Sequence, residues 1–374
     1  MSKRANGEGT IYKRSDGRWT ASVSLAGGRR KSFYGKTRGE VAHKLVAAQK
    51  ARQDGLPLLT ERQTVRIYLQ GWLESVRPSL RPATHKRYSE YVRLHAIPVI
   101  GAVPLTRLSP QHLQRLYANR MEAGLSPTSA GHLHAVLHRA LGQAARWGQI
   151  VRNPADLATR PRAERHEMAA LSPEQARTLL EAARDERLEA LYVLALSTGM
   201  RQGEILALKW PDVDLDGAAL TVRATLQRVG KDFTFSEPKT AGSRRRVSLT
   251  SAAVAALRRH RAAQLEERLR CPYWQDAELV FASQVGTPIE ATHLIRRSFH
   301  PLLIRAGLPR IRFHDLRHTA ATLLLGQGVH PKIVSEMLGH SQIAITLDLY
   351  SHVSPTMQRA AVEAMDAVFA GAGR

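Results

Sequence analysis

Residues 312–328, RFHDLRHTAATLLLGQG, form a helix pattern with a histidine and an arginine at its start. His314 and Arg317 are three residues apart, so a helix presents both on one face. The apolar positions that continue this helix into a core are Ala320, Ala321, Leu323 and Leu324. Gly326 or Gly328 is expected to end it. The H-x-x-R spacing is common by chance, so this stretch alone predicts a helix and not a function.

A second stretch, LSTGMRQGEILALKW (residues 196–210), places an arginine between two glycines. Gly199 and Gly203 bracket Arg201, and Glu204 follows it by one helical turn. A glycine-flanked arginine at a helix start can be held rigidly while the backbone approaches a ligand closely. Taken alone, an ordinary surface arginine at a helix cap explains the pattern better.

Two further stretches carry residues that are unusual only in combination. In SEPKTAGSRRRVSL (residues 236–249), Lys239 is predicted in the turn of a β-hairpin, where a lysine is usually exposed and idle. In LGHSQIAITLDLYSHV (residues 338–353), His340 and Tyr350 flank a predicted turn and helix. Tyrosine is a poor nucleophile at neutral pH, so Tyr350 is either activated by its neighbours or a core aromatic residue.

Together, these stretches place six chemically active residues in one order within one part of the chain. They are Arg201, Lys239, His314, Arg317, His340 and Tyr350. The set resembles the tyrosine recombinase (phage integrase) family, whose pattern is Arg, Lys, His-x-x-Arg, His or Trp, and Tyr. The flanking words TGMRQGE, HDLRHTAAT, LGH and YSHV match as well. The resemblance covers residues 170–355 and extends more loosely to the helical segment before them.

The resemblance implies a site-specific DNA recombinase, an integrase that integrates or excises a mobile element. Tyr350 would attack a DNA phosphodiester and leave a 3′-phosphotyrosine with a free 5′-hydroxyl, which stores the bond energy for religation without ATP. Arg201 and Arg317 would clamp the phosphate, because guanidinium groups bind it in a bidentate fork. Two arginines would then replace the metal that many nucleases need, so we expect no metal and no cofactor.

The resemblance also assigns the proton-transfer roles. Lys239 would protonate the leaving 5′-oxygen as a general acid. His314 would help to accept or shuttle the tyrosine proton, and His340 would hydrogen-bond the phosphate. Glu204 is expected to orient Arg201 or His314. Which histidine is the general base stays open at this point.

The secondary-structure signals divide the chain into three predicted domains of a multidomain α+β fold. Residues 1–58 read as three short strands and a helix, and this small β-sheet domain resembles the family's arm-binding domain. Residues 62–160 read as an all-α core-binding (SAM-like) domain, with Ser-Pro helix starts at 109–110 and 126–127. Residues 168–374 read as a mainly-α catalytic domain with a small antiparallel sheet. Its C-terminal tail helix packs either on its own domain or on a neighbouring protomer.

Local signals set several element boundaries. Thr37 with Glu40 predicts a capping box at the start of the N-terminal domain's helix, and Ser172 with Gln175 predicts another. The segment ELVFAS, residues 278–283, reads as a strand of the catalytic domain.

The charge of the chain favours a polyanionic partner. The formal net charge is +23; residues 1–60 carry +9 and residues 61–165 carry +10, which leaves +4 for the rest. Double-stranded DNA is the partner that we expect. One exposed strand face of the N-terminal domain is predicted to enter a major groove, and a merely solvated basic face is the alternative. The basic residues of this face are Arg18, Arg29, Arg30 and Lys31.

Assembly and location are further expectations from the resemblance. The protein would bind core-type and arm-type attachment sites and form a homotetramer on synapsed DNA, and an accessory DNA-bending or excision factor is a candidate partner. No apolar run is long enough to span a bilayer and no signal peptide is recognisable, so we expect no membrane association. The expected location is the cytoplasm of a bacterial host, at the nucleoid. Cys271 is the single cysteine, so an intramolecular disulfide is excluded.

Two other functions remain open from the sequence. One is a nicking-closing enzyme similar to type IB topoisomerases, which share the Arg-Lys-Arg-His-Tyr chemistry. The other is a non-catalytic DNA-binding regulator on the same scaffold. The two DNA-binding segments before the catalytic domain argue against the first, and the complete set of six residues argues against the second.

Overall fold

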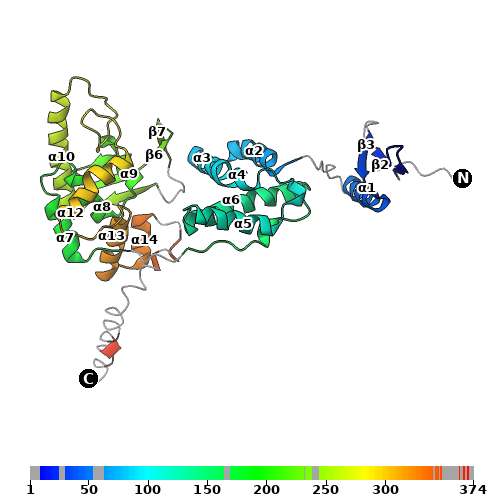
Figure 1. Ribbon diagram of the computed structural model, residues 1–374. Coiled ribbons are helices and arrows are strands. Elements are labelled where there is room, and N and C mark those ends of the chain that lie inside the picture. The colour runs from blue at the N-terminus through cyan, green and yellow to red at the C-terminus, as the bar shows by residue number, and fades with distance from the viewer. Residues whose placement is uncertain are drawn as a thin grey trace. The chain divides into compact units, whose positions relative to one another are not determined.

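The computed structural model describes residues 9–24, 30–53, 63–163, 169–230, 232–237, 244–339, 342–344 and 346–347, together with residues 362, 365, 366 and 369. The chain divides into two compact units, Met1–Arg165 and His166–Arg374. The first unit runs from blue to green in Figure 1, and the second runs from green to red.

The first described segment is a three-stranded antiparallel sheet with one helix packed on it. Its elements are β1 (Thr10–Lys13), β2 (Trp19–Ser24), β3 (Arg30–Gly35) and α1 (Arg38–Gln53), with the strands in the order β1-β2-β3. Its buried core residues are Ala21, Val23, Val41, Leu45 and Ala48. Thr37 caps α1 as predicted, because its Oγ1 accepts a hydrogen bond from Glu40 N at 3.2 Å. Glu40 departs from the predicted box, since its carboxylate accepts from Lys36 N at 3.0 Å.

The strand register corrects one prediction about the basic face. β2 and β3 pair Val23 directly with Lys31, so Lys31 shares the face of the buried Val23, and its neighbour Arg30 lies on the opposite face. Lys31 is half-buried, and burial lowers its pKa. Arg18 and Arg30 are exposed, whereas Arg29 lies outside the described residues. A single exposed face with all four cations is therefore wrong, because neighbouring strand residues alternate between faces.

The second described segment, residues 63–163, is built of helices. They are α2 (Val65–Val76), α3 (Pro82–Glu90), α4 (Ile97–Ile100), α5 (Pro110–Glu122) and α6 (Pro127–Arg146), with a π-helical stretch at Tyr91–Ala96 between α3 and α4. α5 and α6 begin directly after Ser109 and Ser126, as the Ser-Pro pairs predicted. Trp72 and Tyr117 are among the largest side chains of the buried core.

The unit that contains the candidate site is mainly helical. Its helices are α7 (Pro173–Ala182), α8 (Glu189–Thr198), α9 (Gln202–Leu206), α10 (Ser251–Arg270), α11 (Ala291–Leu294), α12 (His300–Arg305), α13 (Asp315–Gly326) and α14 (Pro331–Leu338). Residues 190–196 of α8 are all buried, so α8 forms the centre of the core. The predicted capping box of α7 is confirmed, since Gln175 N donates to Ser172 Oγ and Ser172 N donates to Gln175 Oε1.

Two small antiparallel sheets accompany these helices. β4 (Val213–Asp214), β5 (Ala219–Val222) and β8 (Arg245–Ser248) form one in the order β4-β5-β8, and β6 (Thr225–Val229) and β7 (Asp232–Ser236) form the other. The predicted hairpin around Lys239 is therefore wrong. Within the described residues, β7 pairs with β6 and β8 pairs with β5, so the strands on either side of Lys239 do not pair with each other; Lys239 itself lies outside the described residues.

The predicted strand at residues 278–283 is also wrong. Its backbone makes only isolated bridges, at Leu279 and at Ala282. Residues 279–282 are all buried, so the segment runs through the core without the alternation of inward and outward side chains that a strand on a sheet surface has.

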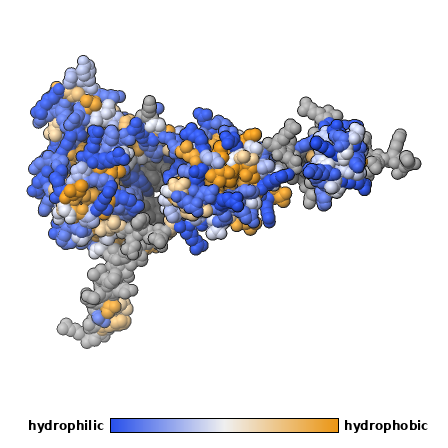
Figure 2. Space-filling view, in the orientation of Figure 1, coloured by the Kyte–Doolittle hydropathy of each residue, from blue (hydrophilic) through white to orange (hydrophobic). Residues whose placement is uncertain are grey.

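The predicted fold class is confirmed, since helices and small antiparallel sheets build a multidomain α+β protein. The bounds of the three predicted domains stay predictions. The C-terminal tail helix also stays a prediction, because only four tail residues from 362 onward are described. The visible surface is largely hydrophilic with scattered apolar patches (Figure 2). Among the described helices, none combines the length and the apolar character that a membrane span requires.

Candidate active site

Arg201 stands at the joint between α8 and α9, and the glycines beside it allow close packing there. α8 ends at Thr198 and is capped by Gly199, whose φ of 61° is left-handed and favours glycine. A Cβ on Gly199 would lie 2.2 Å from Cδ2 of Leu338 in α14. A Cβ on Gly203 would lie 2.5 Å from Oγ1 of Thr225 in β6. Close contacts with α14 and β6 therefore restrict the backbone around Arg201.

Glu204 is a buried carboxylate whose two oxygens are both occupied by arginine donors. Its side chain is 3% exposed. Oε1 accepts a hydrogen bond from Arg201 Nη1 at 2.7 Å, and Oε2 accepts from Arg201 N and from Arg245 Nη2, each at 3.0 Å. Burial by itself would raise the pKa of Glu204, but the charge and hydrogen bonds of Arg245 and Arg201 outweigh it and hold the pKa below its ordinary value. Glu204 is therefore an anion that orients arginines.

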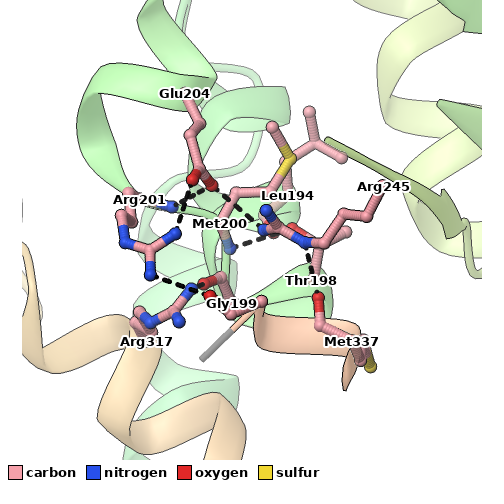
Figure 3. Close-up of polar contacts among 10 residues, drawn as sticks. Leu194, Thr198, Gly199, Met200, Arg201, Glu204, Arg245, Arg317 and Met337 are labelled. Atoms are coloured by element: carbon pink, nitrogen blue, oxygen red, sulfur yellow. Dashed lines mark hydrogen bonds and ion pairs between the residues drawn. The ribbon is translucent and has the colours of Figure 1, made fainter. Parts of the chain in front are cut away.

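Arg317 lies in the first turn of α13 and is only 3% exposed. Its Nη1 donates to the carbonyl oxygen of Gly199 at 2.7 Å. Figure 3 shows the guanidinium groups of Arg317 and Arg201 near each other. Burial, together with the charge of Arg201, lowers the pKa of Arg317 to about 9. Arg317 is still a cation at pH 7, so two positive charges face the same region.

The second terminal nitrogen of Arg317 has no hydrogen-bond acceptor in the described part of the chain. Nη2 is buried and has no hydrogen-bond partner among the described residues. Buried polar groups in native proteins are nearly always paired, and leaving one unpaired costs about 1–3 kcal/mol. An unpartnered guanidinium nitrogen beside a second arginine is the donor set that suits a phosphate oxygen.

His314 is the residue directly before α13, where the sequence placed it with Arg317 on one side of the helix start. Its ring meets that of His318 edge-on, with the ring centroids 5.0 Å apart. Burial, then the positive charges of His318 and Arg317, lower the pKa of His314. Part of the His314 side chain remains exposed to water. Because its pKa is lowered, His314 is neutral at pH 7.

Arg245 is a site residue that the sequence reading missed. Its side chain is 7% exposed, and its Nε donates to the carbonyl oxygen of Met337 at 2.8 Å. In β8, Arg245 shares one face with Val247, and the register pairs Arg245 with the buried Val222. The sequence did contain a signal for this burial. Arg245 alternates with the apolar residues Val247 and Leu249, and alternate residues of a strand lie on the same face.

The structure brings four of the predicted catalytic residues together and describes nothing of the other three. The four are Arg201, Glu204, His314 and Arg317. Lys239, His340 and Tyr350 lie outside the described residues. α14 ends at Leu338 and is capped by Gly339, which has a φ of 68°. The Gly339 carbonyl oxygen accepts a hydrogen bond from Arg201 Nη2 at 3.0 Å. The backbone directly before His340 is therefore tied to Arg201.

The chemistry that this arrangement supports is the binding of an anion. Within the described ranges, no group of three or more metal-binding side chains lies close enough to hold an ion. The carboxylate of Glu204 already accepts from two arginines, so it has little capacity left for a cation. Arg201 and Arg317 instead present positive charge in fixed positions, which is how a protein stabilises a phosphoryl transition state by electrostatics.

Comparisons with known proteins place the chain in a family. The profile of the phage integrase family matches residues 169–357, and that of the phage integrase N-terminal SAM-like domain matches residues 64–121. A tyrosine recombinase XerC-like protein of Caldanaerobacter subterraneus is 33% identical over 361 residues, which cover 91% of this chain and 92% of the relative. An integrase of Saccharopolyspora erythraea is 29% identical over 431 residues, which cover 99% and 98%.

Solved structures share the fold at low identity. The Tn1549 transposon integrase in complex with a circular intermediate DNA matches with a TM-score of 0.68 and 22% identity, over 80% of this chain and 99% of that chain. A lambda integrase tetramer bound to a Holliday junction matches with a TM-score of 0.59 and 18% identity, over 94% and 97%. The family match and the XerC-like relative define an enzyme that breaks and rejoins DNA strands. The chain belongs to the phage integrase family, and it is a site-specific DNA recombinase of the tyrosine type.

Proposed function

We propose that this recombinase cleaves DNA through Tyr350 and that Arg201 and Arg317 hold the scissile phosphate. The observation that carries the proposal is the buried Nη2 of Arg317, which has no partner among the described residues and lies in the electrostatic range of Arg201. A phosphate oxygen supplies the missing acceptor, and its negative charge offsets the repulsion between the two arginines.

In the proposed step, Oη of Tyr350 bonds to phosphorus while the bond from phosphorus to the 5′-oxygen breaks. The products are a 3′-phosphotyrosine and a free 5′-hydroxyl. Arg201 and Arg317 stabilise the negative charge that grows on the non-bridging oxygens, and each such donor is worth roughly 3–4 kcal/mol of activation free energy. Lys239 gives its proton to the departing 5′-oxygen as general acid. Religation runs the same steps backwards with the 5′-hydroxyl of the partner strand as nucleophile.

The remaining roles follow from protonation states. A neutral His314 can accept the proton of Tyr350 or pass it on, because its lowered pKa leaves the ring unprotonated at pH 7. His340 donates a hydrogen bond to the phosphate. Glu204 is a poor base, since both of its oxygens already accept from arginines, and it orients Arg201.

The proposal extends to DNA sites and assembly. Residues 1–58 bind arm-type sites, residues 62–160 bind core-type sites, and residues 168–374 carry the chemistry. The excess positive charge of residues 1–165 supports DNA binding by the first two segments. The active assembly is a homotetramer on synapsed DNA, which an accessory DNA-bending or excision factor assists, in the cytoplasm of a bacterial host. The lambda integrase structure, a tetramer on a Holliday junction, supports this assembly by analogy.

Covalent trapping in cells tests the proposal. The wild type and the Tyr350→Phe variant are expressed, the cells are lysed in denaturant, and DNA that stays attached to the protein is sequenced. We expect attached DNA from the wild type alone, concentrated at one locus, which also identifies the attachment site. Attached DNA from both proteins would refute Tyr350 as the nucleophile. Wild-type DNA that is scattered over the genome would instead support relaxation of supercoils without site preference.

A further inference from the structure

Arg245 is a buried arginine for which the proposed mechanism has no role. We infer that Arg245 is a positioning residue for strand cleavage, one that fixes Arg201 through Glu204 and holds the C-terminal end of α14. The inference rests on the proposed function, because it matters only if Arg201 grips the scissile phosphate. Arg245 itself has 7% of its side chain exposed and is not expected to touch DNA.

The hydrogen bonds of the two arginines form a closed frame. Arg245 Nη2 and Arg201 Nη1 donate to different oxygens of the same carboxylate, Glu204, at 3.0 and 2.7 Å. Arg245 Nε donates to the carbonyl oxygen of Met337 at 2.8 Å, and Arg201 Nη2 donates to that of Gly339 at 3.0 Å. Figure 3 shows Glu204 between the two arginines, and Met337 below Arg245. Three elements, β8, α9 and the end of α14, are thereby joined.

The frame has geometric consequences for the site. The carbonyl groups at the end of α14 are the negative end of its dipole, so two cations there are favourable and hold the helix end in place. Gly339 directly precedes His340 in the chain. Arg245 therefore acts on both sides of the candidate phosphate site, on the arginine that would grip the phosphate and on the backbone that leads to His340.

The charges show why a substitution would move Arg201. Glu204 divides its charge between two guanidinium groups, and its pKa stays low mainly through Arg245. Without Arg245, the buried carboxylate would depend on Arg201 alone, and the end of α14 would lose its bond at Met337. Arg201 would then be drawn toward Glu204 and away from a bound phosphate. A small misplacement of a catalytic group costs up to about 100-fold in rate.

The test compares Arg245→Gln with a matched control, Arg246→Gln. Arg246 is the next residue of the same strand, but its side chain is 68% exposed and only approaches Asp214, at 3.7 Å. The substrate is the duplex recovered by covalent trapping, nicked beside the cleavage point so that religation is prevented. Three quantities are measured at saturating DNA or by titration: the first-order rate constant of covalent complex formation, its final amplitude, and the Kd for DNA.

We expect Arg245→Gln to lower the rate constant roughly 10- to 100-fold, with the amplitude and the Kd close to the wild-type values. Arg246→Gln should change the rate constant less than about threefold, as surface substitutions usually do. A purely structural role would act differently, because a misfolded fraction lowers the amplitude and leaves the rate constant of the folded fraction unchanged. Arg245→Lys keeps the charge but cannot reach Glu204 and Met337 at once, so an intermediate rate constant is expected.

A double substitution separates action through Arg201 from any independent effect. In the Arg201→Lys background, Arg245→Gln should slow cleavage much less than it does in the wild type, because the group that it positions is already gone. Full additivity, or a wild-type rate constant in Arg245→Gln, would overturn the inference. If the wild type itself forms no covalent complex, both the proposed function and the inference are refuted. If the wild type and Arg246→Gln form the complex at the same rate as Arg245→Gln, only the inference about Arg245 is refuted.

Discussion

Replacing Arg317 by methionine should separate catalysis from folding. The side chain is buried, it has one strong hydrogen bond, and one of its nitrogens has no partner among the described residues. Methionine is similar in length and apolar, so it fills the same space without a charge. The expected result is a large loss of cleavage with little change in stability.

The magnitudes follow from the contacts of Arg317. Its bond to the Gly199 carbonyl oxygen involves a charged donor and contributes about 1.5–3 kcal/mol, whereas the unpartnered Nη2 costs about 1–3 kcal/mol. These contributions nearly cancel, so the net change in the free energy of unfolding is expected to be small. Cleavage instead loses one transition-state donor, which corresponds to a fall of about 10²- to 10³-fold.

Two assays on the same protein check this reasoning. Urea unfolding of the wild type and of Arg317→Met should differ by less than about 2 kcal/mol in unfolding free energy, while single-turnover cleavage of a nicked duplex falls 100-fold or more. Arg297→Met serves as the control, because Arg297 is an exposed arginine of the same unit. A destabilisation above about 3 kcal/mol would show that Arg317 is mainly structural, and cleavage within tenfold of the wild type would refute its role as a clamp.

Three further predictions concern the backbone joint, protonation and salt. Gly199→Ala should cost roughly 2–4 kcal/mol in urea unfolding, because it combines a left-handed backbone with a clash against Leu338; unchanged stability would contradict the close approach of α14. The pKa of His314 is lower in the folded chain than in the unfolded chain, so protonation of its ring at acid pH favours unfolding. Cleavage should also fall as the pH drops below neutral and the ring becomes protonated. In His314→Asn, cleavage should be slower at pH 7, and the fall of the cleavage rate toward acid pH should disappear. An unchanged fall would show that another group is responsible for it. The logarithm of DNA affinity should fall steeply against the logarithm of salt concentration, since residues 1–165 carry most of the excess charge; a nearly flat plot would mean that few phosphates are contacted.

Local signals in the sequence predicted those parts of the site that depend on neighbouring residues. Ser172 with Gln175 predicted the start of α7. The glycines around Arg201 allowed a rigidly held arginine, although taken alone they favoured an ordinary surface arginine. His314 and Arg317 were placed correctly because both belong to one helix start. In each case the physical cause, a cap or a backbone conformation, lies within a few residues of the pattern.

Contacts between distant segments were not predictable in the same way. Arg245 bonds Glu204, 41 residues earlier, and Met337, 92 residues later. Its neighbours Arg244 and Arg246 make the stretch look like a uniformly solvated basic run. The hairpin around Lys239 failed for a related reason: strand pairing is chosen by partners elsewhere in the chain, and β8 pairs with β5 instead of β7.

Arg317 Nη2, which has no hydrogen-bond partner among the described residues, makes the choice of buffer matter for measurements on this protein. Sulfate and inorganic phosphate carry oxygen acceptors for such a donor, and a ligand that binds only the folded chain raises its apparent stability with the logarithm of ligand concentration. The same ions would have to leave before a DNA phosphate could enter. Melting temperatures in phosphate would then overstate the stability of the empty enzyme, and cleavage rates in sulfate would report competition as well as chemistry.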